Sequence, residues 1–156
     1  ADPGVVADLL PALAGNPELL LGDYYFEHPD GRRVLRKGSG LPVTAHRLYR
    51  SSPTHSATLI RTELFRVVGE YDTSFRVMGD YDWFLRAILR RGAVAMPVGR
   101  AISVFNAEGI STRLKNSPVL AAEKRRLRRT YYPRFYGCRW AVNEAVGRWQ
   151  SVWKGR

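Results

Sequence analysis

The chain has 156 residues, of which 45% are hydrophobic and 12% aromatic. A chain of this length and composition can bury one core, so we expect a single globular unit and not two full domains. The lone cysteine, Cys138, excludes an internal disulfide and a cysteine-built metal cluster. No apolar run approaches the roughly 18 residues of a membrane-spanning helix. The first residues also lack the basic region of a secretory signal, so we expect a cytoplasmic protein.

The net charge of +11 is unevenly distributed along the chain. Residues 1–111 hold 13 basic and 12 acidic residues, whereas residues 112–156 hold 12 basic residues against only Glu123 and Glu144. A nucleic-acid-binding domain is expected to spread its basic residues over the folded face. The near-neutral body therefore disfavours nucleic acid as a partner, and only the tail is strongly basic.

The first predicted elements are a helix and a β-hairpin. Asp2 supplies an N-cap, Pro3 follows at the first helical position, and apolar residues recur on one face as far as Gly15. Residues 18–27 are too few and too rich in β-formers for another helix, so they predict a strand. Residues 28–37 then predict a turn and the returning arm of the hairpin.

In the middle of the chain, hydrophobic patterns typical of helices alternate with patterns typical of strands. In chain order we expect an irregular connection at 38–53, a buried strand at 55–60, a short helix at 61–68 ended by Gly69, a helix from Asp80 to Gly92, and strand-like runs at 93–98 and 101–105. This alternation predicts an α/β fold.

Residues 117–156 predict a helical basic tail, separate from a body at 1–116. Ser117-Pro118 opens a very basic helix, a break follows, and a second helix carries an apolar stripe made of Val142, Val146, Trp149 and Trp153. Three interpretations of the tail stay open. Its cations and aromatic rings suit an anionic membrane surface, its charge could attract nucleic acid, and its stripe could pack on the body.

Asp80-Tyr81-Asp82 has the D-x-D spacing that many sugar-nucleotide enzymes use to hold a metal ion. That use suits an extended segment, in which side chains at i and i+2 share a face. In a helix that starts at Asp80 the two carboxylates diverge by about 200°. Asp82 then pairs with Arg86 one turn on, as a structural ion pair. Asp80 is either an N-cap or a catalytic group.

The order of these elements resembles the second half of family 2 glycosyltransferases. Residues 53–92 contain a strand, a helix similar to the family's "rrelf" (RTELF), a glycine, a turn similar to "fDe.f" and an acidic helix similar to "eDydl.lR" (GDYDWFLR). The match extends to LLLGDYYFEHPDGR at 19–32, which is similar to the hairpin after the family's metal-binding loop. It also extends to FNAEGIS at 105–111, similar to an aromatic-then-GGxS ending. The resemblance covers about residues 1–112.

This resemblance implies the acceptor-side, carboxy-terminal half of a GT-A (Rossmann-like) glycosyltransferase fold. It implies that Asp80 is the general base that removes a proton from an acceptor hydroxyl, with inversion at the sugar carbon. The remaining site residues that it implies are Asp23 on the donor side and, around the acceptor, His55, Trp83, Gly109 and Ser111.

Several of these residues have a structural alternative. A lone histidine before a strand, such as His55, is often a hydrogen-bonded structural residue. Asp23 could cap the hairpin, and Trp83 could pack in the core. The first glycine of the family's glycine-rich turn is Glu108 in this chain, which leaves only the backbone bend at Gly109.

The resemblance also implies a part that precedes residue 1. The family's acidic loop holds Mg²⁺ or Mn²⁺ against the donor diphosphate, and this chain offers no ligands for that ion. We therefore expect a piece of a longer enzyme, inactive in isolation, whose partners are a nucleotide-sugar donor and a saccharide or lipid-linked acceptor. If the acceptor is lipid-linked, we expect the basic tail to lie at the inner face of a membrane. The competing hypothesis is a non-catalytic module that binds anionic membrane or nucleic acid through residues 117–156.

Overall fold

The computed structural model describes residues 4–38, 43–106, 109–114, 116–134 and 136. They form a mixed α/β fold in which helices cover a four-stranded mixed sheet, and this confirms the α/β part of the prediction. None of the described helices is long and apolar enough to cross a membrane.

β1 (Leu19–Glu27) is the centre of the sheet and pairs with all three other described strands. β4 (Ala95–Asn106) runs parallel to it along one edge. On the other edge, β3 (Thr58–Ile60) pairs antiparallel with the first half of β1 and β2 (Arg33–Arg36) with the second half. The predicted hairpin is therefore confirmed as β1 and β2. The first five residues of β1 are buried, which fits a run of three leucines at the centre of a sheet.

β4 is one strand, although the sequence predicts two separate runs at 93–98 and 101–105. Its pairing with β1 shifts beside Gly99, which has φ +62°, a left-handed conformation that favours glycine. Gly22 of β1 permits the close approach of the two strands, because a Cβ there would lie 2.5 Å from Ile102 Cγ1. The Gly99-Arg100 pair therefore makes a bulge inside a strand and not a turn between strands.

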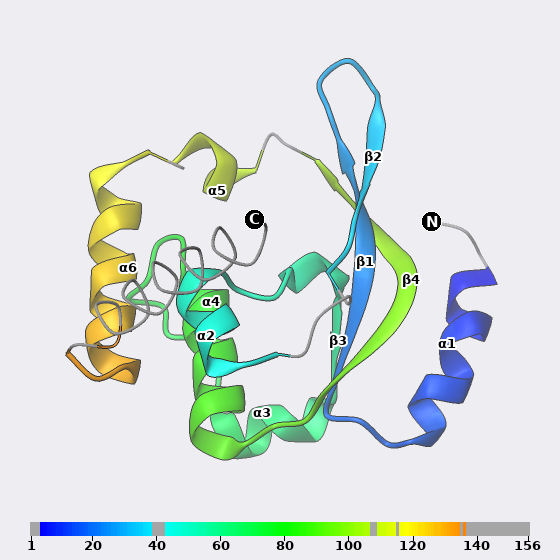
Figure 1. Cartoon of the computed structure of the whole chain (residues 1–156), viewed down its shortest axis with the longest axis horizontal. Helices are drawn as coiled ribbons and strands as arrows, with labels where there is room; N and C mark the ends of the chain where they lie inside the picture. The colour runs from blue at the N-terminus through cyan, green and yellow to red at the C-terminus, as the bar shows by residue number, and fades with distance from the viewer. Residues whose placement is uncertain (1–3, 39–42, 107–108, 115, 135, 137–156) are drawn as a thin grey trace, which may run out of the picture.

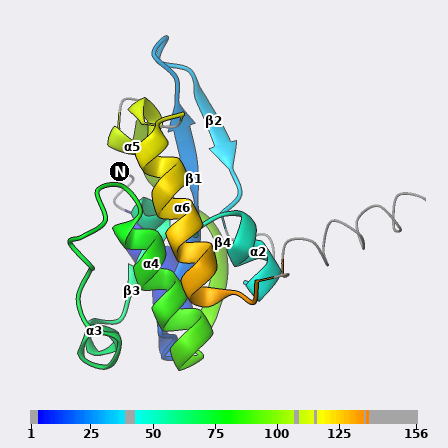
Figure 2. The ribbon, with the colours of Figure 1, turned by 90° about the vertical axis from the view of Figure 1, so that its left-hand side faces the viewer.

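The helices lie on both faces of the sheet. α1 (Gly4–Ala14) covers one face, whereas α2 (Ala45–Arg50) and α4 (Gly79–Leu85) lie on the other side (Figure 1). α6 (Pro118–Tyr131) runs alongside α4 (Figure 2) and lies farther from the sheet (Figure 1). The short helices α3 (Thr62–Val68) and α5 (Ile110–Arg113) complete the described part.

Three boundaries differ from those predicted. α2 forms inside the predicted irregular connection, capped by Thr44, whose Oγ1 accepts a hydrogen bond from Arg47 N–H at 3.1 Å. Residues 55–57 form a 3₁₀ turn before β3, and Leu59 of that strand is 44% exposed, so the predicted buried strand is shorter and less buried. α4 begins one residue before Asp80 and continues into a π-helical turn at Arg86–Arg90.

α4 is buried on two sides, against two groups of side chains. The sheet-side core comprises Leu19, Leu64, Trp83, Phe84, Ala87 and Ala93. The α6-side core comprises Leu48, Phe75, Tyr81, Leu85, Leu127 and Tyr132. Because Leu127 of α6 and Tyr132 directly after it belong to this second core, the predicted basic helix packs on the body. The predicted second tail helix and Cys138 lie outside the described residues.

Candidate functional site

Asp80 is the second residue of α4, where the first N–H groups of the helix have no partner within it. Its carboxylate is half-buried, and Oδ1 accepts a hydrogen bond from Tyr81 N–H at 2.7 Å. The capping position belongs to Met78, which makes no side-chain capping bond, so Asp80 is not the N-cap that the sequence allowed. Burial raises the pKa of Asp80, against the opposing effects of the Tyr81 N–H and the charge of His55.

His55 and Tyr71 lie close enough to Asp80 to interact with it electrostatically. His55 Nε2 and Tyr71 Oη are 2.8 Å apart, in hydrogen-bonding contact. Burial raises the pKa of Tyr71, and the negative charge of Asp80 raises it further. Both rings are exposed enough to meet solvent. The structure thus brings together a carboxylate, an imidazole and a phenol from three separate segments.

Tyr71 is the member of this group that sequence analysis missed. It lies in a turn-rich segment, EYDTSF, where no spacing distinguishes it from a solvent-facing loop residue. Its ring is held edge-on to Phe65, at 5.6 Å between centroids, and to His55, at 5.8 Å. The aromatic packing therefore fixes the phenol in front of His55.

Trp83 belongs to the core and not to the surface of this site. Its side chain is fully buried, its ring packs on Phe65 at 4.6 Å, and Nε1 donates a hydrogen bond to Gly69 O at 2.8 Å. No face of the ring is open to a saccharide. Of the two roles that the sequence allowed, the structure shows core packing.

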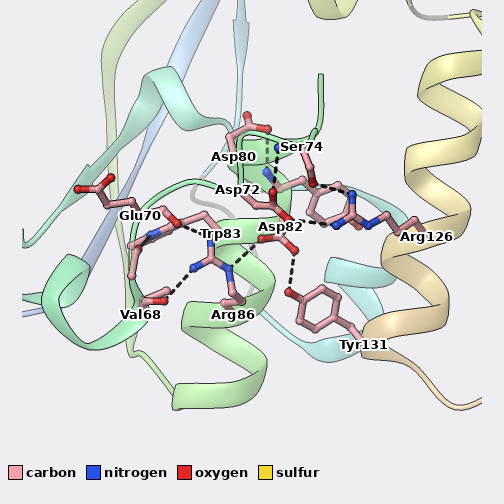
Figure 3. Close-up of polar contacts among 12 residues, drawn as sticks. Val68, Glu70, Asp72, Ser74, Asp80, Asp82, Trp83, Arg86, Arg126 and Tyr131 are labelled. Atoms are coloured by element: carbon pink, nitrogen blue, oxygen red, sulfur yellow. Dashed lines mark hydrogen bonds and ion pairs between the residues drawn. The ribbon is translucent and has the colours of Figure 1, made fainter. Parts of the chain in front are cut away.

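The predicted ion pair of Asp82 is present, but it is buried and forms part of a larger network. Arg86 Nε donates to Asp82 Oδ2 at 2.8 Å, and Tyr131 Oη donates to Asp82 Oδ1 at 2.7 Å (Figure 3). Arg86 also donates to the carbonyl oxygens of Val68 and Glu70, at 2.8 and 2.7 Å. Burial raises the pKa of Tyr131, and the hydrogen bond to Asp82 raises it further. The hydroxyl of Tyr131 therefore stays protonated and donates.

The contacts of Asp82 argue against a metal ion held between Asp80 and Asp82. Both oxygens of Asp82 already accept hydrogen bonds, and the two carboxylates point in different directions (Figure 3). Among the residues that the structure describes, no three His, Cys, Asp or Glu side chains gather as metal ligands. Asp80 and Asp82 therefore do not fit a shared divalent ion.

The segment before Asp80 is held by α6. The carboxylate of Glu123 accepts three hydrogen bonds in succession, from the backbone N–H groups of Arg76 (2.7 Å), Val77 (3.1 Å) and Met78 (3.0 Å). Glu123 thus binds the backbone directly before α4, as far as the N-cap residue Met78, through charge-assisted hydrogen bonds. No local pattern in the sequence marks this contact, because Glu123 lies 45 to 47 residues after its partners.

Arg126, one helical turn further along α6, holds the same segment from its exposed side. It donates to Asp72 Oδ2 at 3.1 Å and to Ser74 Oγ at 2.8 Å, and its guanidinium lies over the ring of Phe75 (Figure 3). The basic helix that the sequence predicts as part of a separate tail therefore positions the start of α4, and with it Asp80.

The other predicted site residues lie in other elements. Asp23 is 4% exposed and lies inside β1, opposite Ala101 of β4, rather than at the turn of the hairpin. Gly109 precedes α5, and its carbonyl oxygen accepts hydrogen bonds from the N–H groups of Thr112 and Arg113. Ser111 lies within α5. The structure thus unites Asp80 with His55, whereas it places Gly109 and Ser111 at a short helix and Asp23 in the sheet.

Comparisons with known proteins provide no relative from which a function could be taken. No family model matches the chain, and neither a curated protein nor a solved structure matches it.

Proposed function

We propose that this chain is the acceptor-side part of an inverting glycosyltransferase, in which Asp80 is the general base. The observation that supports it is the position of Asp80. Its carboxylate is half-buried, carries a raised pKa, and neighbours the hydrogen-bonded pair of His55 and Tyr71. A carboxylate with a raised pKa is a stronger base, and it is suited to proton abstraction near neutral pH.

The proposed reaction is a single displacement. Asp80 takes the proton of an acceptor hydroxyl while that oxygen attacks the anomeric carbon of the donor sugar. The new carbon–oxygen bond forms on the face opposite the breaking bond to the nucleoside diphosphate, so the configuration inverts. The diphosphate leaves with its electron pair, and the proton stays on Asp80 until solvent removes it.

In this proposal His55 orients the acceptor. Its Nε2 is engaged with Tyr71 Oη, which fixes the ring, and the exposed imidazole can direct a hydroxyl or a phosphate of the acceptor towards Asp80. The acceptor is a saccharide or a lipid-linked saccharide, and the enzyme acts at the cytoplasmic face of a membrane.

The proposal places the nucleotide-sugar and its Mg²⁺ or Mn²⁺ ion in a part of the protein outside these residues. When bound, such an ion neutralises the charge that develops on the leaving diphosphate. Asp82 cannot contribute to that ion, because Arg86 and Tyr131 occupy its two oxygens.

The competing hypothesis of a purely basic binding module is weakened by the contacts of α6. Glu123 and Arg126 of that helix are engaged with the segment at 72–78, so part of its charge serves packing. We therefore favour the enzyme.

The test is transfer by the full-length protein that contains this chain. Asp80→Asn keeps the shape of the side chain and removes the base, so we expect kcat to fall by about 10²–10⁴-fold while the donor still binds. Asp30→Asn is the matched control, because Asp30 lies in the exposed hairpin turn. A kcat for Asp80→Asn within a few-fold of the wild type would remove Asp80 from the role of base.

A further inference from the structure

A cavity lies away from Asp80, between α2 and the end of α6. Its volume is about 610 Å³, within the size range of ligand sites in proteins. The residues that line it are Tyr49, Arg128, Arg129, Tyr132, Pro133 and Arg134. Three of them are arginines, and none of these described lining residues is acidic. The cavity therefore concentrates positive charge beside aromatic walls.

Arg128 is placed in this cavity with an unmet hydrogen-bonding capacity. Its guanidinium lies over the ring of Tyr49, 4.4 Å from the centroid, and its Nε is buried without a hydrogen-bond partner in the described part of the chain. Buried polar nitrogens in proteins are nearly always hydrogen-bonded, so the Nε of Arg128 is an exception that calls for an explanation.

The aromatic walls are fixed by their own contacts. Tyr132 Oη donates to Ala45 O at 3.1 Å, and its ring packs edge-on to Tyr49 at 5.1 Å between centroids. Pro133 follows directly and leads the chain to Arg134, so that an arginine beyond the helix returns to the same cavity as Arg129 within it. The walls thus hold their geometry without a ligand.

A purely structural role does not account for this arrangement. Cations near the carboxyl end of a helix are stabilised by its dipole, but that effect requires neither a cavity nor a buried nitrogen. Arg126 of the same helix shows how an arginine used for packing is satisfied, since it bonds Asp72 and Ser74. Arg128 has no such acidic partner among the described residues.

We propose that this cavity binds the phosphate group of a phosphorylated ligand, with Arg128, Arg129 and Arg134 around the phosphate oxygens and Tyr49 and Tyr132 beside its organic part. Arginine suits this task because its planar fork donates two parallel hydrogen bonds to a phosphate. The site is independent of the glycosyltransferase proposal. The phosphate belongs either to a soluble molecule or to a lipid headgroup, and the two sources can be separated.

The experiment measures binding to the complete 156-residue chain in two arms. Calorimetric titration with inorganic pyrophosphate tests a soluble phosphate. Co-sedimentation with phosphatidylcholine vesicles, with and without phosphatidic acid, tests a phosphate on a membrane. Arg129→Gln is the principal variant, because Arg129 is exposed and its loss leaves the packing intact. Arg125→Gln is the matched control, since it removes the same charge from an exposed position of α6 outside the cavity.

We expect Arg129→Gln to weaken binding about tenfold or more, and Arg128→Gln at least as much, whereas Arg125→Gln changes it by less than about threefold. This pattern with pyrophosphate identifies a soluble ligand, and the same pattern only with phosphatidic acid identifies a lipid. The proposal is overturned if neither probe binds, or if Arg125→Gln weakens binding as much as Arg129→Gln. It is also overturned if a single-stranded oligonucleotide binds tightly and all three variants weaken it equally, because that result describes a general basic surface.

Discussion

The two sides of α4 are buried by different means. The sheet-side core is built from apolar side chains such as Trp83 and Phe84, and its polar contacts are few. The α6 side adds to its apolar core a set of charged contacts, centred on Asp82 and on Glu123. Apolar burial is non-directional, whereas charge-assisted hydrogen bonds fix geometry. The comparison indicates that the sheet side maintains the fold and that the α6 side sets the position of Asp80.

The largest effect is expected on the sheet side. Trp83→Ala removes a fully buried ring together with the hydrogen bond to Gly69, so it should lower the free energy of unfolding by about 3–5 kcal/mol. Denaturant unfolding followed by circular dichroism measures this loss. A change below about 1 kcal/mol would show that Trp83 is not part of the main core.

A smaller and more local effect is expected on the α6 side. Glu123→Gln leaves one carbonyl oxygen for three backbone N–H groups, and should lower the free energy of unfolding by about 1–3 kcal/mol. Hydrogen exchange at the amides of residues 76–78 should become faster. Glu70→Gln, at an exposed side chain of the same segment, is the control and should leave these amides unchanged. Unchanged exchange in Glu123→Gln would contradict the role of Glu123 in holding residues 76–78.

The smallest expected effect is a gain in stability, and it arises at Asp80. Burial raises the pKa of Asp80, so its ionisation opposes folding. The stability that the protonated form provides is present below the ordinary pKa of 3.8 and is lost as the pH rises through the raised value. Asp80→Asn should therefore increase the melting temperature at neutral pH, and the difference from the wild type should vanish in acid. Equal melting temperatures at pH 7 would indicate that Asp80 is not destabilised by burial.

The elements that the sequence predicts well are those with a local signal. The β-hairpin has turn residues between two β-rich runs, and α4 has apolar residues at helical spacing. The sequence does not predict α2, because this helix has only six residues and a single threonine cap, and its neighbours are residues that favour turns. The bulge in β4 carries a glycine with positive φ, which by itself does not distinguish a bulge from a turn.

The candidate site was only partly predictable for a related reason. Asp80 and His55 stand beside recognisable elements, whereas Tyr71 has no pattern that sets it apart. Glu123 meets its partners across 45 to 47 residues of sequence, a contact that only the packing of α6 creates. Asp82 and Arg86 follow the spacing of neighbours on a helix, and this local pair was predicted.

The pH dependence of transfer tests the role of Asp80 most directly. In the full-length protein, kcat/KM should fall as the pH decreases through the pKa of Asp80, because only the ionised carboxylate accepts the proton. The positive charge of His55 holds that pKa down, so His55→Gln should move the acidic limb to higher pH, and Asp80→Asn should abolish the limb. An acidic limb that stays at the same pH in both variants would contradict this account of the site.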